Sequence, residues 1–130
     1  MIRTKKKAAK KHAVSTGHLD YLWRLAVRTR WNGRCAMCSS DEVECHHIVK
    51  RARTLLRWDI TNGICLCAEH HKFAATKEGE RRVAALIGPA NYDYLCAKER
   101  ILYRTYLQAQ GMTDNEYRKL MADALKEMIG

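Results

Sequence analysis

Apolar residues first recur in a regular pattern near residue 18. Residues 1–17 contain few apolar side chains and carry the runs Lys5-Lys6-Lys7 and Lys10-Lys11, so we predict a disordered basic arm there. A helix is predicted after the arm, because five apolar residues have the spacing of one helical face: Leu19, Leu22, Trp23, Ala26 and Val27. The pair Asn32-Gly33 is a turn signal and predicts the end of this helix.

Short apolar runs in the middle of the chain indicate two strands followed by a helix. Residues 43–49 fit a short strand, and residues 64–67 fit a returning strand. Between them, residues 50–58 are predicted to form a basic loop, and residues 59–63 contain a turn signal. A helix that begins near Ala68 completes a predicted ββα unit.

Helical patterns continue through the rest of the chain. Residues 81–87 predict a short helix that Gly88-Pro89 terminates, and residues 91–110 predict a longer one. Thr113 and Glu116 have the spacing of a capping box, which predicts the start of a last helix. The chain is therefore divided into three predicted parts: an arm at residues 1–17, a core at residues 18–79 and a helical tail packed on that core at residues 80–130.

The positive charge of the chain is concentrated near its N-terminus. The formal net charge is +10, and residues 1–34 hold ten Lys or Arg against the single acid Asp20, a net of +9. The remainder is close to neutral. A strongly basic chain favours a polyanionic partner such as nucleic acid. The alternative for the basic N-terminal segment is a solubilising tail.

Four candidate metal ligands form two closely spaced pairs. Cys35 and Cys38 make a Cys-x2-Cys pair, and Cys67 and His70 make a Cys-x2-His pair. These spacings favour a tetrahedral Cys3His zinc site over a disulfide framework. Cys65 is an alternative fourth ligand, but its spacing to Cys67 is too tight for the usual chelate geometry. We therefore expect a structural zinc ion at the base of the ββα unit.

A second group of candidate ligands surrounds the predicted zinc site. His46 and His47 lie in the first strand, Asn62 precedes the second strand, and His71 follows the second ligand pair. Because adjacent residues on a regular strand point to opposite faces, His46 and His47 cannot both bind one ion. One histidine is expected to hold a metal and the other to act as a general base, since imidazole suits both roles near neutral pH. A purely structural role is the alternative.

The order and spacing of these residues resemble those of the HNH (ββα-metal) endonucleases. Members often show a Cys-x2-Cys knuckle, an (Asp/His)-His-Ile strand, and an Asn-x8-His spacing that ends in Leu-Cys-x2-(Cys/His)-His. The matching segments here are Glu44-Cys45-His46-His47-Ile48, Asn62 and Leu66-Cys67-Ala68-Glu69-His70-His71. The chain departs from the pattern at His46, where many members have Asp, and at His70, where Cys is more common. Imidazole can ligate a metal in both places.

The resemblance implies an α+β fold with a zinc-stapled ββα-metal motif, an N-terminal helix and a C-terminal helical tail. By position, His46 and His71 would bind a catalytic divalent ion, and His47 would deprotonate the attacking water. Asn62 would either brace the loop that orients His47 or contact the metal. The implied function is metal-dependent hydrolysis of DNA phosphodiester bonds, by a nicking activity with weak sequence specificity.

The catalytic ion is expected to be Mg²⁺ or Mn²⁺ by availability, and Ni²⁺ or Co²⁺ should substitute, because imidazole ligands suit these softer ions better than Mg²⁺. The segment Arg57-Trp58-Asp59-x2-Asn62 is also similar to a motif in phage and prophage HNH-type proteins. Contacts to DNA are expected mainly at phosphates, from basic residues near the predicted catalytic residues: Lys50, Arg51, Arg53, Arg57 and Lys72. The alternative for the basic loop is a solvated run of charges.

Two other functions are compatible with the sequence. A non-catalytic zinc module that binds DNA or a phage assembly partner would need only the four zinc ligands, and would hold one metal per chain rather than two. An RNA nuclease, or a toxin regulated by an antitoxin, would use the same residues as the DNA nuclease. The chain lacks the pattern of a signal peptide or a membrane span, so we expect a cytoplasmic protein of a bacterial or phage-infected cell, monomeric or homodimeric.

Overall fold

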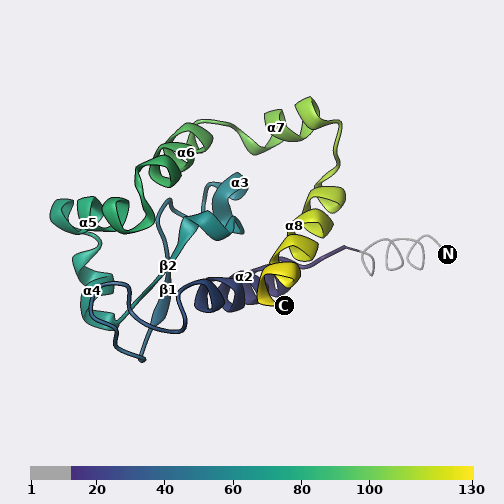
Figure 1. The fold of residues 1–130 in the computed structure, drawn as a ribbon. Coiled ribbons are helices and arrows are strands. Elements are labelled where there is room, and N and C mark those ends of the chain that lie inside the picture. Colours follow the sequence, from purple (N-terminus) through teal and green to yellow (C-terminus); the bar gives the residue numbers. More distant parts are fainter. Residues whose placement is uncertain (1–12) are drawn as a thin grey trace.

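A computed structural model of the chain describes residues 13–130, which form helices around a small two-stranded sheet (Figure 1). Most of the predicted basic arm lies outside the described residues. Helix α2 (Thr16–Arg30) begins two residues earlier than predicted, because the hydroxyl of Ser15 caps it by accepting from the His18 N–H at 3.1 Å. The other elements follow in this order: β1 (Glu44–His47), α3 (Thr54–Arg57), the 3₁₀ turn η1 (Ile60–Asn62), β2 (Gly63–Leu66), α4 (Ala68–Phe73), α5 (Lys77–Ile87), α6 (Pro89–Glu99), α7 (Tyr103–Gln110) and α8 (Asp114–Ile129).

The two strands pair antiparallel and are covered on both faces. All four residues of β2 are buried. Cys65 packs in a core cluster with α2, whereas its neighbours Ile64 and Leu66 pack in a second cluster with residues of α5 and α6. Cys45 of β1 packs against the α2 cluster as well, and because successive strand residues point to opposite faces, Glu44 and His46 point to the other face. The predicted mixed fold, helix-rich with a small antiparallel sheet, is confirmed.

The C-terminal helices surround the sheet and return the chain to its first helix. Helices α5, α6 and α7 follow one another along one side of the molecule, and α8 packs beside α2 (Figure 1). Trp58 is 1 % exposed and packs with α2 and α8. No helix in the described part of the chain is both long enough and apolar enough to cross a membrane.

The prediction of secondary structure was wrong at residues 91–110 and incomplete at residues 50–58. Residues 91–110 do not form one helix, because α6 ends at Glu99 and α7 begins at Tyr103. The break has a packing reason: Leu95 joins the cluster beside α5, and Leu107 joins the α2–α8 cluster on another side of the molecule. The predicted loop at residues 50–58 also contains the short helix α3.

Several terminal signals acted as predicted. Gly88 ends α5, and Pro89 occupies the first turn of α6. Thr113 and Glu116 form both hydrogen bonds of a capping box at the start of α8. Helix α5 begins earlier than predicted, at Lys77, because the Thr76 hydroxyl accepts from the Gly79 N–H at 3.0 Å.

Gly63 is placed where a larger residue would collide with α2. Its φ of −135° is ordinary extended backbone, so the constraint is the missing Cβ rather than backbone freedom. A Cβ there would lie 2.3 Å from Val27 Cγ2 and 2.8 Å from Trp23 Cζ2, and both partners are buried. Gly63 therefore lets the sheet approach α2 closely.

We expect Gly63→Ala to lower the free energy of unfolding by about 1–3 kcal/mol, because the added methyl group overpacks the core between β2 and α2. Gly17→Ala is the matched control, since a Cβ at Gly17 of α2 meets nothing within 4 Å. The control should be neutral or slightly stabilising. Urea denaturation of the two variants measures the difference, and equal stabilities would contradict the proposed close approach.

Candidate metal centre and histidine cluster

A turn after α2 presents the first pair of cysteines. The Cys35 N–H donates to Ser40 O at 2.8 Å, and the Ser39 N–H donates back to Cys35 O at 2.9 Å, which closes the turn. The Ala36 N–H donates to Cys65 O of β2 at 2.9 Å. This knuckle is therefore fixed to the edge of the sheet, opposite the start of α4.

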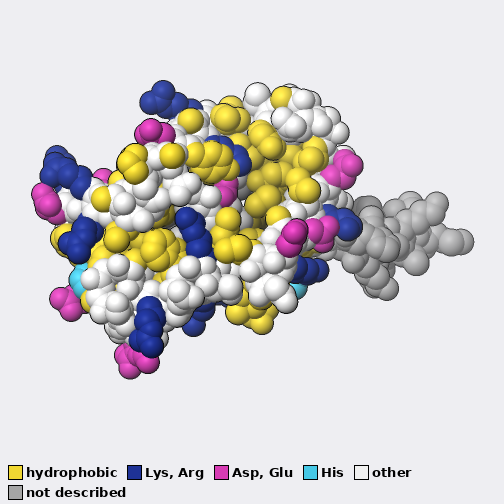
Figure 2. All heavy atoms as spheres, in the orientation of Figure 1, with side chains coloured by type: hydrophobic (Ala, Val, Ile, Leu, Met, Phe, Trp, Pro, Cys, Tyr) yellow, Lys and Arg dark blue, Asp and Glu magenta, His cyan; other side chains and the backbone are white. Residues whose placement is uncertain are grey.

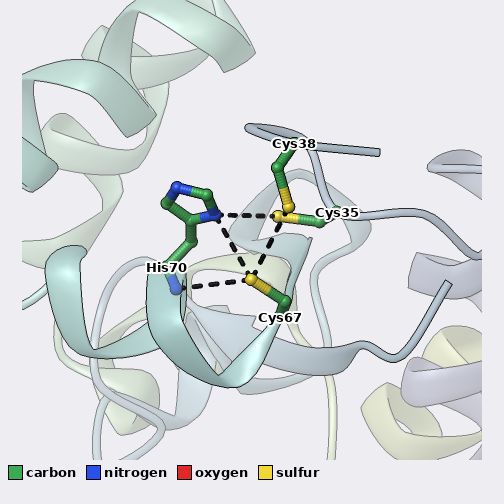
Figure 3. Close-up of side chains that lie close together, drawn as sticks. All are labelled: Cys35, Cys38, Cys67 and His70. Atoms are coloured by element: carbon green, nitrogen blue, oxygen red, sulfur yellow. Dashed lines mark hydrogen bonds between the residues drawn. The ribbon is translucent and has the colours of Figure 1, made fainter. Parts of the chain in front are cut away.

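The first residues of α4 supply the second pair. Cys67 is the N-cap of α4, and His70 lies one turn later. The ligand atoms of Cys35, Cys38, Cys67 and His70 all lie within 4.8 Å of one another (Figure 3). The predicted Cys3His group is thus brought together from two segments that are about thirty residues apart in the sequence.

The spacing of these four atoms fits a tetrahedral zinc-type ion. The Sγ atoms of Cys38 and Cys67 are 3.7 Å apart, and His70 Nδ1 lies 3.6 Å from Cys35 Sγ and 3.2 Å from Cys67 Sγ. Two thiolates on one zinc ion with bonds of about 2.3 Å lie about 3.8 Å apart in a tetrahedron. Cys65, the alternative fourth ligand, lies outside this group and is fully buried against α2.

Backbone amides favour the metal-binding form of Cys35. Burial raises the pKa of its thiol, but hydrogen bonds from the backbone at Cys67, Met37 and Cys38 outweigh this effect. The resulting pKa is about 6. One of these contacts is the Met37 N–H, which lies 3.4 Å from Cys35 Sγ. The lowered pKa favours the thiolate of Cys35, which is the form that binds a metal.

The second predicted group is divided between the two faces of the sheet. His46 and His71 lie together, with ring centroids 4.8 Å apart and ring planes at 73°. Burial, reinforced by the neighbouring His71 and His47, lowers the pKa of His46 to about 4, so its imidazole is neutral and can offer a lone pair. His71 is oriented by Glu44, whose Oε1 lies 2.9 Å from His71 Nδ1. A proton on His71 Nδ1 leaves Nε2 free to bind a metal.

His47 lies on the α2 side of β1, at the last position of the strand. Its ring stacks on Trp23, with centroids 3.8 Å apart and planes at 3°. His47 Nε2 lies 2.9 Å from Arg57 O, and a carbonyl oxygen can only accept a hydrogen bond, so Nε2 carries the proton. In the neutral ring, Nδ1 is then the atom that can accept a proton. Burial lowers the pKa of His47 and favours this neutral form.

Asn62 braces the loop between the strands. It is fully buried, and its Oδ1 accepts from the Val49 N–H at 2.7 Å. Its Nδ2 donates to Val49 O at 2.9 Å and to Leu56 O at 3.0 Å. Of the two roles considered for Asn62, these contacts fit the bracing role, because its amide group is fully engaged with the backbone of the loop that begins after His47.

The predicted DNA-binding cations differ in their surroundings. Lys50, Arg51, Arg53 and Lys72 are exposed. Arg57 is half-buried, and its guanidinium is paired with Asp20. On the face drawn in Figure 2, Lys and Arg side chains are dispersed among Asp and Glu side chains, and hydrophobic side chains gather between α7 and α8.

Three residues that contact the histidines or support such a contact had no predicted role in the site. Glu44 precedes His46 by two positions, so the strand period could have placed both on one face. Asp20 is the single acid in a basic segment, which is a usable signal, whereas Trp23 looked like an ordinary helix core position.

Comparisons of this chain with known protein families, curated proteins and solved structures gave no match. The function must therefore be inferred from the residues of the site.

Proposed function

We propose that this chain is a metal-dependent endonuclease of the HNH (ββα-metal) type that hydrolyses phosphodiester bonds of DNA. The observation that carries the proposal is the pairing of His46 from β1 with His71 from α4, with ring centroids 4.8 Å apart. The Cys3His group anchors the N-terminus of the same helix α4. A closed set of soft ligands beside two imidazoles is consistent with one structural ion and one catalytic ion.

His46 and His71 would hold the catalytic ion. His46 is neutral at physiological pH, and the contact between Glu44 and His71 Nδ1 leaves His71 Nε2 as the ligand atom. A divalent ion bound there would polarise the phosphate and stabilise negative charge on the leaving oxygen. With two imidazole ligands, Mn²⁺, Ni²⁺ or Co²⁺ should support activity at least as well as Mg²⁺.

His47 would act as the general base. At the end of β1, where His46 and His47 are consecutive residues, a water molecule would attack the phosphorus atom and pass its proton to His47 Nδ1. The bond between phosphorus and the 3′ oxygen then breaks, and the 3′ oxygen takes a proton from solvent. Arg57 O and the Trp23 ring hold His47 in place throughout. The products are a 5′ phosphate and a 3′ hydroxyl.

One such site per chain cuts one strand, so a monomer is expected to nick duplex DNA. The exposed residues Lys50, Arg51, Arg53 and Lys72 would contact phosphates. Phosphate contacts carry little sequence information and weaken with salt, so we expect weak sequence specificity and steep salt dependence.

We expect two metal ions per wild-type chain, one zinc and one Mn²⁺, and open-circular product from supercoiled plasmid when Mn²⁺ or Mg²⁺ is present. Elemental analysis and Mn²⁺ titration measure the metal count. The double variant His46→Ala/His71→Ala should keep the zinc and lose the Mn²⁺ site together with nicking. His18→Ala, which alters an exposed histidine of α2, is the control and should retain both ions.

Other results would identify a different function. A single zinc ion per chain, with plasmid bound but never cut, would support the zinc module that binds DNA or a protein partner. Cleavage of RNA but not of DNA by the same two-metal protein would keep the site and change the substrate. The wild-type chain should therefore be assayed on both nucleic acids in parallel.

A further inference from the structure

We propose that Asp20 is a positioning residue for proton transfer: through Arg57, it fixes the tautomer and orientation of His47. This inference rests on the proposed function, because it gives Asp20 a role in preparing the base of that reaction. Asp20 lies on α2, Arg57 is the last residue of α3, and His47 ends β1. The carboxylate of Asp20 is therefore linked to His47 through Arg57, across three elements of the fold.

The first contact is a bidentate ion pair between Arg57 and Asp20. Arg57 Nε donates to Asp20 Oδ1 at 3.0 Å, and an Arg57 terminal nitrogen donates to Asp20 Oδ2 at 2.9 Å. Trp58 Nε1 also donates to Asp20 Oδ1, at 2.9 Å. Such a planar pair fixes the guanidinium in one orientation. The carboxylate of Asp20 thereby holds two consecutive residues at the end of α3.

The second contact links this pair to the base. The carbonyl of Arg57 lies at the C-terminus of α3, where helix carbonyls lack intrahelical partners, and it accepts from His47 Nε2 at 2.9 Å. The position of this carbonyl decides which ring nitrogen of His47 carries the proton. The side chain of Arg57 controls that position because its guanidinium is fixed on Asp20.

The same face of α2 also fixes the plane of the ring. Trp23 lies three residues after Asp20 and stacks on His47 at 3.8 Å. Trp23 is itself anchored, since its Nε1 donates to Asp59 O at 3.0 Å. His47 is therefore held at Nε2 by the Arg57 carbonyl and on one ring face by Trp23, and Asp20 is the charged residue that supports the first of these contacts.

Asp20 is suited to this role because it remains charged. Burial raises the pKa of its carboxyl. The hydrogen bonds from Arg57 and Trp58, together with the charge of Arg57, outweigh this effect, so the pKa is lowered overall. Asp20 is also the single acid among residues 1–34, a segment with ten Lys or Arg. An acid that served only solubility or DNA binding would not be expected in this segment.

The test compares Asp20→Asn with Asp114→Asn in the zinc-loaded full chain. Asp114 pairs with Arg118 at the same distance of 2.9 Å, at the start of α8. Nitrogen-15 NMR of the imidazole ring at one neutral pH reports which nitrogen of His47 is protonated. We expect Asp20→Asn to convert the single Nε2–H tautomer into a mixture and to lower kcat by about tenfold with KM unchanged.

Three further variants separate positioning from general folding effects. Asp20→Glu keeps the carboxylate and should restore most of the Nε2–H tautomer and of kcat. The double variant Asp20→Asn/Arg57→Ala should be no more impaired in kcat than Arg57→Ala, because Asp20 acts through Arg57. Asp114→Asn should leave the tautomer of His47 and kcat as they are in the wild type.

The outcomes distinguish this proposal from the proposed function. A wild-type tautomer in Asp20→Asn, or an equal loss in Asp114→Asn, would overturn the positioning role even if plasmid is cut. A changed tautomer in Asp20→Asn alone, in a protein whose wild type cuts neither DNA nor RNA, would support the contact chain and overturn the nuclease.

Discussion

Replacement of His47 by alanine is expected to lower the rate of plasmid nicking by a factor of about 10² to 10⁴, with the zinc content unchanged. The reason is local. His47 Nε2 is occupied by Arg57 O, so Nδ1 is the single ring atom left to take a proton from water. Alanine removes that acceptor and leaves the ligands His46 and His71 in place. Single-turnover nicking of supercoiled plasmid with Mn²⁺ measures the effect.

His47 is half-buried against Trp23, so its loss also removes packing. The melting temperature of the variant must therefore be measured with its activity. His47→Gln is a useful second variant, because it fills part of the ring volume but cannot act as a base near neutral pH. His18→Ala serves as the control for loss of an exposed histidine. A folded, zinc-loaded His47→Ala protein that nicks at the wild-type rate would remove His47 from the mechanism.

Local signals in the sequence were sufficient to predict much of the framework. Thr113 and Glu116 begin α8 as a capping box because both partners lie within one helical turn. The Cys-x2-Cys pair likewise lies in a tight turn and the Cys-x2-His pair at the start of α4, and only one further step, the pairing of β1 with β2, brings them together. Signals of this kind depend on few residues at short spacing, so tertiary packing seldom overrides them.

The features that sequence reasoning missed depend on distant contacts. The break between α6 and α7 contains neither proline nor glycine, and it is set by Leu95 and Leu107 packing in different clusters. The stack of Trp23 on His47 joins α2 to β1, and its apolar spacing predicts only that Trp23 faces a core. The ion pair of Asp20 with Arg57 spans thirty-seven residues of sequence. No periodicity along the chain specifies such partners.

The two groups of ligands are coupled through one short helix. His70 and His71 are neighbours on α4, and they belong to the Cys3His group and the histidine pair respectively. Cys67 caps the same helix. An ion held by the Cys3His group would therefore fix the position of His71 relative to His46. Loss of that ion should affect both the stability of the chain and the geometry of the histidine pair.

Cys67→Ala is accordingly expected to abolish zinc binding and to unfold the region from Cys35 to α4. A structural zinc site contributes about 10–16 kcal/mol in small zinc domains, which is comparable to the total stability of about 5–15 kcal/mol typical of a whole domain. Apart from the packing of Cys35, Ala36 and Met37 against a core cluster, the knuckle at residues 35–40 is held by turn hydrogen bonds and one bond to β2. Elemental analysis and thermal unfolding measure the loss.

Cys96→Ala is the matched control, because Cys96 is a partly buried cysteine of α6 outside the ligand group. It should bind one zinc ion and melt near the wild-type temperature. Amide exchange should show where Cys67→Ala fails: protection is lost in β1, β2 and α4 and is partly retained in α2 and α8, which pack against each other away from the ligands. A Cys67→Ala protein with wild-type protection in α4 would mean that packing alone supports the sheet, and that the four ligands have no structural role.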